Sequence, residues 1–125
     1  MTEVRIKGGE ELNGLGVMLK EILDKNLRYP GKYKSIRNLN ATVVIKETSS
    51  GVAVTLNFRG GEIEIQNDAV DKPTAYMEAG FENLAYVCSG QLHPIKAMLM
   101  GKLKSRGNPL TLLKISKMTV LNRAE

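Results

Sequence analysis

The clearest pattern of hydrophobic and polar positions lies between residues 42 and 66. Residues 52–59 alternate apolar and polar side chains, the pair at 60–61 is Gly-Gly, and residues 62–66 resume the alternation. A β-branched stretch, residues 42–47, precedes them across a turn at residues 49–51. A period of two indicates strands, and Gly-Gly is typical of a two-residue hairpin. We therefore expect a three-stranded antiparallel meander with one apolar and one polar face.

A helical period of three and four residues replaces the period of two in residues 12–27 and again after residue 80. The first segment has one apolar face and ends at the sequence Tyr29-Pro30-Gly31; its face holds Leu12, Leu15, Leu19, Ile22 and Leu23. The second segment ends at Gly90, where a C-terminal helix glycine is expected; its apolar face holds Phe81, Leu84, Ala85 and Cys88. Both segments are predicted to be amphipathic helices.

Two further helix starts are marked by a residue that can cap a helix and a proline that directly follows it. His93-Pro94 opens a short helix with Ile95, Met98 and Leu99 on its apolar side, and Asn108-Pro109 opens a helix with Leu110, Leu112 and Leu113. Residues 74–78 and 102–106 are predicted as a fourth and a fifth strand. We expect one α+β domain over residues 1–125: a five-stranded, mostly antiparallel sheet covered on one face by helices.

The composition agrees with one globular domain and shows where the excess charge lies. The chain has 125 residues, of which 42% are hydrophobic and 25% are charged, which are ordinary values. Residues 1–90 carry 11 basic and 12 acidic side chains, whereas residues 91–125 carry seven basic ones against Glu125 alone. This asymmetry suits an anionic partner such as a phospholipid headgroup, a phosphorylated ligand or nucleic acid; a solvated face with counterions explains it equally well.

The sequence also bears on the cellular compartment. The first residues, MTEVRIKGGEEL, contain no apolar leader segment, and the apolar runs are too short to span a bilayer. The single cysteine excludes an internal disulfide. We expect a cytoplasmic protein.

The sequence contains no recognisable catalytic or metal-binding motif. His93 is the only histidine and no serine, cysteine or carboxylate is linked to it by a known motif, so we expect it to cap a helix or lie on the surface. Cys88, on an apolar helix face, is predicted to be a core residue. Glu62 and Glu64 share a strand face with Gln66, as on the wet side of a sheet. We therefore expect no enzyme activity, no cofactor and no metal.

Methionine gathers in the C-terminal half of the chain, at Met77, Met98, Met100 and Met118. Its side chain is flexible and can line a pocket that accepts varied shapes. Ordinary core filling explains any one of these residues. The group beside two short helices bounded by glycine favours a cavity.

Residues 82–113 resemble the sterol carrier protein type-2 family of lipid-transfer domains. The resemblance rests on the run Asn83-Leu84-Ala85-Tyr86-Val87-Cys88-Ser89-Gly90, on Pro94, and above all on Gly101-Lys102-Leu103-Lys104-Ser105-Arg106-Gly107-Asn108. In that family a short helix ends in a glycine, a second helix follows an Asn-Pro-like pair, and a Gly-Lys-Leu run leads to a final helix. The order of elements agrees over most of the chain.

The resemblance implies a hydrophobic tunnel between the sheet and its helices, in which members bind sterols, fatty acids, acyl-CoA or other lipids without chemical change. The tunnel would be lined by apolar residues of three helices and one strand: Phe81, Leu84, Ala85, Cys88, Ile95, Met98, Leu99, Leu103, Leu110 and Leu113. Three cations, Lys102, Lys104 and Arg106, would contact an anionic headgroup or a membrane surface.

The leading hypothesis is non-catalytic binding and transfer of a lipid, which could be a fatty acid, an acyl-CoA, a sterol-like or an isoprenoid lipid. A second hypothesis is an accessory module that presents a lipid-like substrate to a lipid-metabolising enzyme. A nucleic-acid-binding protein that uses the basic C-terminal third is disfavoured, because the chain has only six aromatic residues and none lies among the basic residues of that third. A thioesterase-like enzyme would need an acid or base that the sequence does not identify.

Overall fold

The three-stranded meander predicted from the alternating pattern forms the centre of the sheet. This is a computed structural model, and it describes residues 3–120. Strands β2 (Asn40–Glu47), β3 (Ala53–Arg59) and β4 (Glu62–Asn67) are antiparallel neighbours. Val43 lies opposite Leu56, and Phe58 lies opposite Ile63, so the large apolar side chains of adjacent strands share one face. The pairing register therefore places the alternating apolar residues on one face, and the predicted three-stranded antiparallel meander is confirmed.

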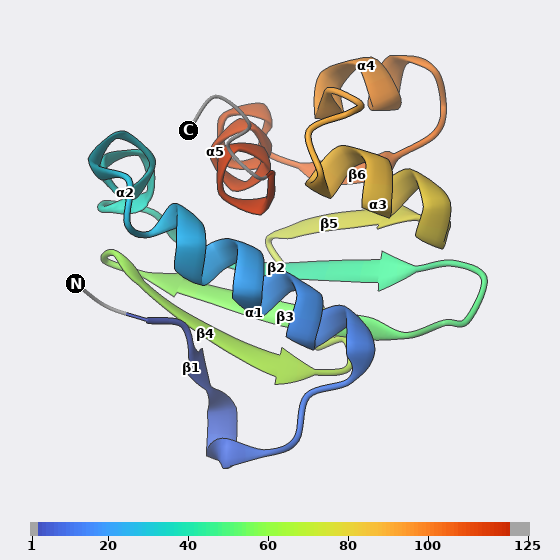
Figure 1. The fold of residues 1–125 in the computed structure, drawn as a ribbon. Helices are drawn as coiled ribbons and strands as arrows, with labels where there is room; N and C mark the ends of the chain where they lie inside the picture. The colour runs from blue at the N-terminus through green and yellow to red at the C-terminus, as the bar shows by residue number, and fades with distance from the viewer. Residues whose placement is uncertain (1–2, 121–125) are drawn as a thin grey trace.

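The sheet has six strands in the order β1-β4-β3-β2-β5-β6, one more than expected (Figure 1). The additional strand, β1 (Arg5–Ile6), pairs parallel with β4 and has two residues, too few to show a period. Strand β5 (Ala75–Ala79) pairs parallel with β2, and β6 (Lys104–Gly107) pairs antiparallel with β5 at the far edge. The fold is therefore α+β with a mixed sheet.

Capping residues and prolines place the helices. Helix α1 (Gly14–Asn26) begins directly after its N-cap residue, Asn13, whose side chain accepts a hydrogen bond from the Gly16 N–H. The basic segment after it forms helix α2 (Pro30–Ile36), with proline at its first position. A short 3₁₀ helix, η1 (Lys7–Gly9), follows β1.

The last three helices follow the predicted boundaries closely. They are α3 (Phe81–Cys88), α4 (Pro94–Leu99) and α5 (Pro109–Thr119). His93 Nδ1 accepts a hydrogen bond of 3.1 Å from the Ile95 N–H, so His93 caps α4 as expected. Asn108 Oδ1 accepts hydrogen bonds from the Leu110 and Thr111 N–H groups and caps α5.

The hydrophobic core lies between the apolar sheet face and the helices, and α1 runs across that face (Figure 1). The sheet contributes alternate residues of its central strands, all buried: Val43, Ile45, Val54, Leu56, Phe58, Ile63 and Ile65. From α1, Leu19 and Leu23 are buried against them, as the helical period predicts.

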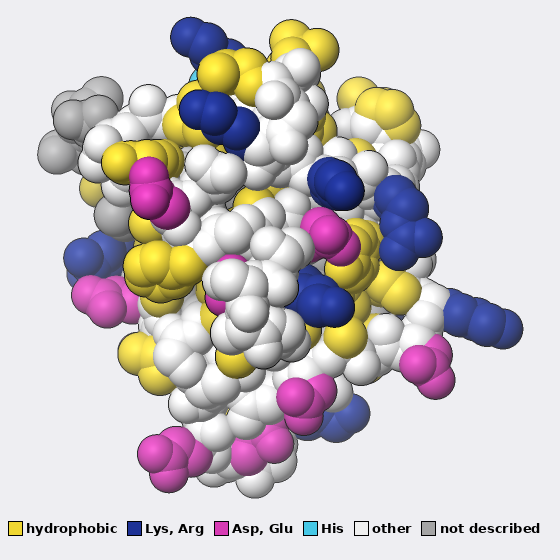
Figure 2. Space-filling model, turned by 90° about the vertical axis from the view of Figure 1, so that its right-hand side faces the viewer, with side chains coloured by type: hydrophobic (Ala, Val, Ile, Leu, Met, Phe, Trp, Pro, Cys, Tyr) yellow, Lys and Arg dark blue, Asp and Glu magenta, His cyan; other side chains and the backbone are white. Residues whose placement is uncertain are grey.

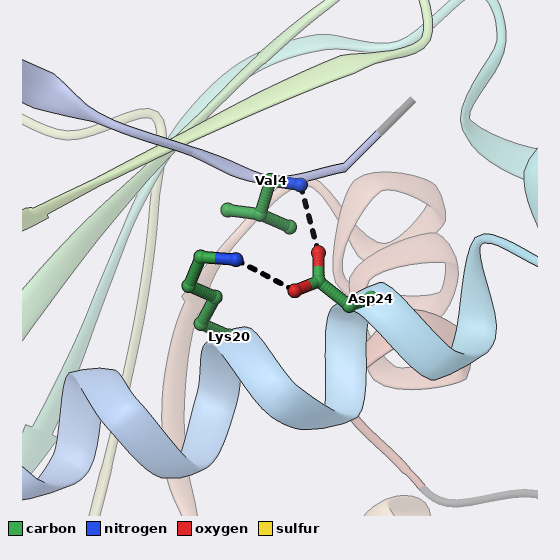
Figure 3. A network of polar contacts seen from close by, with 3 residues as sticks. All are labelled: Val4, Lys20 and Asp24. Carbon is green, nitrogen blue, oxygen red and sulfur yellow. Dashed lines mark hydrogen bonds and ion pairs between the residues drawn. The ribbon is translucent and has the colours of Figure 1, made fainter. Parts of the chain in front are cut away.

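A polar network joins the segment before β1 to α1 (Figure 3). The Val4 N–H donates to Asp24 Oδ1 at 2.8 Å, and Lys20 Nζ donates to Asp24 Oδ2 at 2.7 Å. Val4 itself is a buried core residue. The carboxylate therefore positions β1 at the sheet edge while Lys20 balances its charge from the same helix.

A second polar cluster holds the end of α5 against α1 and α2. The buried Asn26 donates from Nδ2 to the carbonyl oxygens of Met118 at 2.7 Å and Val120 at 3.0 Å. Lys32 Nζ donates to Asn26 Oδ1 at 3.1 Å and to the Val120 oxygen at 2.7 Å. The last carbonyls of a helix have no intrahelical donor, so these two side chains supply donors where they are needed.

Candidate functional site

An apolar cavity lies between the sheet face and the helices that cover it. Its walls come from α1, β2, β5, α3, the start of α4, the segment before β6, and α5; they are Leu15, Met18, Leu19, Ile45, Met77, Leu84, Val87, Cys88, Pro94, Leu103, Ser116 and Thr119. The space open to a water-sized sphere is about 20 Å³. Within residues 3–120, the expected tunnel is therefore represented by a small cavity at the centre of the helical layer.

The described walls of this cavity carry no ionisable group apart from the thiol of Cys88. Their other polar atoms are the hydroxyls of Ser116 and Thr119. Ser116 Oγ donates to the Leu112 carbonyl at 2.8 Å and Thr119 Oγ1 donates to the Ile115 carbonyl at 3.1 Å. A hydroxyl that donates keeps lone pairs that can accept, so both oxygens can receive a hydrogen bond from a ligand.

The thiol of Cys88 is unsuited to nucleophilic chemistry. Cys88 is a free, buried cysteine, and desolvation by burial raises its pKa to about 11 from 9.0. The thiolate is the reactive form and it is disfavoured in such an apolar site. The expectation that Cys88 is a core residue is confirmed, and its side chain also borders the cavity.

The residues predicted from the family resemblance fall into three groups. Leu84, Cys88 and Leu103 are buried and border the cavity. Ala85 and Met98 are partly buried outside it. The other five are exposed to solvent, from 39% for Leu113 to 84% for Leu99: Phe81, Ile95, Leu99, Leu110 and Leu113.

The orientation of α4 and α5 accounts for four of the five exposed residues; the fifth, Phe81, is the first residue of α3. Helix α4 turns Pro94 and Ala97 inward, and the Ala97 carbonyl accepts hydrogen bonds from the N–H groups of Lys102 and Leu103. These local hydrogen bonds close the C-terminal end of α4, and Ile95 and Leu99 lie on its exposed side. Helix α5 buries the face that includes Ile115 and Ser116.

The family resemblance did not identify the wall that α1 supplies. Leu15, Met18 and Leu19 of α1 face the cavity across from α3. The helical period of residues 12–27 predicted a helix with one buried face. It does not indicate which part of the molecule that face contacts. Met77, a member of the predicted methionine group, borders the cavity from β5.

The three predicted cations are exposed and do not gather at the cavity. Ser105 lies opposite the buried Met77, so Lys104 and Arg106 on either side of it point to the other face of the sheet. There the Arg106 guanidinium lies 4.8 Å from the centre of the Tyr76 ring. Lys102 precedes the strand, in the turn after α4.

The outer face of the sheet is polar. A groove across it is lined by both acidic and basic side chains, among them Arg5, Arg59, Glu62 and Glu64. Arg5 and Glu62 form an exposed ion pair of 3.4 Å. Glu62 and Glu64 therefore lie on the wet side of the sheet, as expected.

Over residues 3–120, no group of three His, Cys, Asp or Glu side chains is placed to hold a metal ion. In the same range, every helix is too short or too polar to cross a bilayer.

The fold is similar to several solved structures at low sequence identity. The sec-alkylsulfatase Pisa1 from Pseudomonas sp. matches 90% of this chain with a TM-score of 0.72 and 10% identity, but the match covers only 17% of that enzyme. A protein described as UbiJ-SCP2 ubiquinone synthesis protein has a TM-score of 0.63, 14% identity and 85% coverage of both chains. Apo sterol carrier protein 2 from Yarrowia lipolytica has a TM-score of 0.62 and 16% identity, over 91% of this chain and all of that one.

The sequence comparisons identify the family. No individually curated protein sequence matches the chain significantly. The sequence model of the SCP-2 sterol transfer family matches residues 19–119, a range that begins in α1 and ends with α5. Because that match covers 101 of the 125 residues, from 19 to 119, the chain belongs to the SCP-2 sterol transfer family.

Proposed function

We propose that this protein binds the apolar body of a lipid in the cavity beneath α1, α3 and α5 and transfers it without chemical change. The observation that carries the proposal is the cavity wall, which is apolar apart from two hydroxyls and a protonated thiol. Membership of a lipid-transfer family supports the same ligand class. The high pKa of Cys88 and its apolar surroundings argue against covalent catalysis at this place.

Binding requires the cavity to widen. Pockets for small ligands typically enclose roughly 300–1,000 Å³, whereas the free space here is about 20 Å³. The segment that includes α4 lies between Gly90 and Gly101, which adopt positive φ angles of 84° and 73°. We propose that the cavity widens by a shift of this segment. A side-chain contact between α4 and β6, from Ser105 Oγ to Met98 Sδ, is a weak hydrogen bond to sulfur.

The driving force is the burial of methylene groups. At about 0.8 kcal/mol for each methylene, a chain of about ten carbons gains about 8 kcal/mol before costs. Loss of translational and rotational freedom alone costs roughly 4 kcal/mol or more. We therefore expect measurable binding only for lipids with chains of about ten carbons or longer, and for comparably large sterol-like or isoprenoid bodies.

The cavity wall favours uncharged atoms inside. A buried carboxylate without a cationic partner is strongly disfavoured, so a fatty acid or acyl-CoA would keep its charged head outside. A ligand hydroxyl could donate to Ser116 Oγ or Thr119 Oγ1, whose own protons are directed to the α5 backbone. Among the candidate lipids, those with a neutral polar end are the best suited to enter completely.

A second candidate function is an accessory module that presents a lipid-like substrate to a partner enzyme. Two similar structures motivate it: one is a short part of a sulfatase chain, and another is described as a ubiquinone synthesis protein. The two functions differ in whether the protein alone takes up lipid and releases it to vesicles. Transfer by the isolated protein supports a carrier, and uptake without release supports the module.

Native mass spectrometry of protein purified without detergent, with organic extraction of any bound molecule, tests the proposal directly. We expect a lipid-sized mass that is absent from the Ser116→Leu variant, in which a larger side chain fills the cavity. Leu113→Ser, on the exposed side of the same helix, is the matched control and should keep the ligand. A protein that carries no lipid and takes up no fluorescent fatty acid or sterol would refute the proposal.

A further inference from the structure

Strand β6 forms an open edge of the sheet. It is the last strand in the order and pairs with β5 on one side only. In an antiparallel pair, alternate residues of an edge strand direct their N–H and C=O groups away from the neighbouring strand. Over residues 3–120, no other backbone group forms a hydrogen bond with that outer side of β6. The opposite edge strand, β1, has only two residues, so β6 offers the longer edge for a further strand.

A groove follows this edge, and its volume is about 590 Å³. Residues of β5, α4, β6 and the turn before β6 line it: Tyr76, Glu78, Met98, Gly101, Leu103, Lys104, Ser105 and Arg106. We call these eight residues the β6 groove. Successive residues of a strand point to opposite faces of a sheet. Because the groove contacts Lys104, Ser105 and Arg106 together, it runs along the edge of β6 and includes parts of both faces.

The two sides of the β6 groove differ in their chemistry. On the helix side, Ser105 Oγ donates to Met98 Sδ at 3.0 Å, and the side chain of Leu103 borders both the groove and the cavity. On the outer side lie the exposed cations Lys104 and Arg106. A chain segment in the groove would therefore meet mostly apolar atoms on one side and positive charge on the other.

The positive charge on the outer side is available to an external anion. The ion pairs described within residues 3–120 involve neither Lys104 nor Arg106. Glu78 lies opposite Lys104 on β5, but its carboxylate accepts a hydrogen bond from the Tyr76 hydroxyl. On the right half of Figure 2, at the height of β5 and β6 in Figure 1, basic side chains gather beside hydrophobic ones. A carboxylate of a partner can therefore approach both cations.

We propose that the β6 groove docks an extended, acidic strand of a partner protein, which adds to the sheet beside β6. The backbone of that strand would pair with the open N–H and C=O groups, and its acidic side chains, at every second position, would face Lys104 and Arg106. A second copy of this chain is disfavoured as the occupant, because two adjacent β6 strands would bring like charges together. The proposal goes beyond the proposed function, since it does not depend on what the cavity binds.

Fluorescence anisotropy with synthetic peptides tests the docking. The probe is a fluorescein-labelled peptide that alternates glutamate with valine, and its control has lysine at each glutamate position. The lysine peptide should bind roughly tenfold more weakly, because attractive cross-strand pairs become repulsive ones. Two further peptides keep the glutamates but are N-methylated at alternate residues, one in each phase. Only the phase that removes the N–H groups facing β6 should lose binding, because the other places its methyl groups on the open side.

Charge reversal in the protein identifies the surface. Lys104→Glu should weaken binding of the glutamate peptide roughly tenfold and strengthen binding of the lysine peptide, because it reverses the charge that faces the strand. Lys34→Glu changes an exposed lysine on α2 by the same charge and should alter neither. Far-ultraviolet circular dichroism checks that both variants fold.

Several results would overturn the docking proposal. They are equal binding of the glutamate and lysine peptides, equal effects of the two protein variants, and equal binding of the two methylated peptides. Absence of binding at about 1 mM glutamate peptide, the weak end of specific recognition, would also overturn it. So would a single-stranded DNA oligonucleotide that displaces the glutamate peptide and binds more tightly, because the cations would then serve a nucleic acid.

Uptake of a fluorescent fatty acid by the wild-type protein, measured without peptide, separates this proposal from the proposed function. Peptide binding by a protein that takes up no fatty acid would support docking and refute lipid binding. Uptake of the fatty acid without peptide binding would refute docking and leave lipid binding intact.

Discussion

Leu84→Ala should weaken the fold and at the same time improve binding in the cavity. Leu84 lies on α3, is buried, and borders the cavity beside Val87 and Cys88. Replacing it by alanine removes three carbons from the wall and joins their volume to the existing space. The same change that costs core packing therefore enlarges the proposed binding site.

The magnitude follows from the lost packing. Three carbons at about 0.8 kcal/mol each amount to about 2.4 kcal/mol of transfer free energy. A cavity term of about 24 cal/mol per Å³ adds to it where the walls do not collapse. Because Leu84 already borders open space, relaxation can remove little of that volume, and we expect a loss of about 3–4 kcal/mol in the free energy of unfolding.

Urea unfolding with and without decanol, followed by far-ultraviolet circular dichroism, measures both effects; the chain has no tryptophan for a fluorescence assay. Decanol has a ten-carbon chain and a neutral hydroxyl that can donate to Ser116 or Thr119. A ligand at a hundred times its dissociation constant raises the free energy of unfolding by about 2.7 kcal/mol. Decanol should thus restore much of the stability lost in Leu84→Ala, and should restore more than it adds to wild type.

Leu27→Ala provides the matched control. Leu27 is buried in the core near the end of α1 and does not border the cavity. It should lose similar stability, since the same three carbons are removed, and gain nothing extra from decanol. Equal stabilisation of both variants by decanol, or of neither, would refute the assignment of the cavity as the lipid site.

Three further predictions concern residues outside that experiment. Asn26→Ala removes the donor to the Met118 carbonyl and should cost about 2–4 kcal/mol in urea unfolding; a cost below about 1 kcal/mol would show that water replaces the amide. Hydrogen bonds from the side chain and backbone of Ser49 and from Ser50 hold the pKa of Glu47 at about 2, below 4.5. Because a lowered carboxyl pKa stabilises the fold above the ordinary value, stability should fall from about pH 4.5 to about pH 2, and Glu47→Gln should flatten that part of the pH profile; an unchanged slope would contradict it. With a pKa raised from 9.0 to about 11, Cys88 should react with a disulfide reagent about a hundredfold more slowly than a free thiol at pH 8, and rapid reaction in the folded protein would place it at the surface.

Local sequence patterns determined the elements themselves. The alternation through residues 52–66 predicted β3 and β4 with the correct face buried, because a strand shows one face at every second residue. Pro94 and Pro109 marked the starts of α4 and α5, because proline fits the first turn of a helix and the preceding side chain caps it. These signals depend on neighbours in the chain, so one sequence was enough to recognise them.

The arrangement of the elements depended on contacts between distant residues. Nothing local to β5 indicates that it pairs parallel with β2, and β1 is too short to carry a period. For the same reason, some of the residues predicted to line the tunnel border the cavity and others lie on the surface. An apolar helix face is visible in the sequence wherever the helix lies, but the side of α4 that is buried holds Pro94 and Ala97, and Leu99 lies exposed.

We predicted five features from the sequence: the family resemblance, the α+β class, the central meander, the capped helices and the basic C-terminal third. Three features became visible only in the folded chain: α1 forms a cavity wall, Lys104 and Arg106 point away from that cavity, and α4 exposes Leu99. The physical reason is that a side chain's direction follows from its local backbone, whereas its burial depends on which other element packs against it.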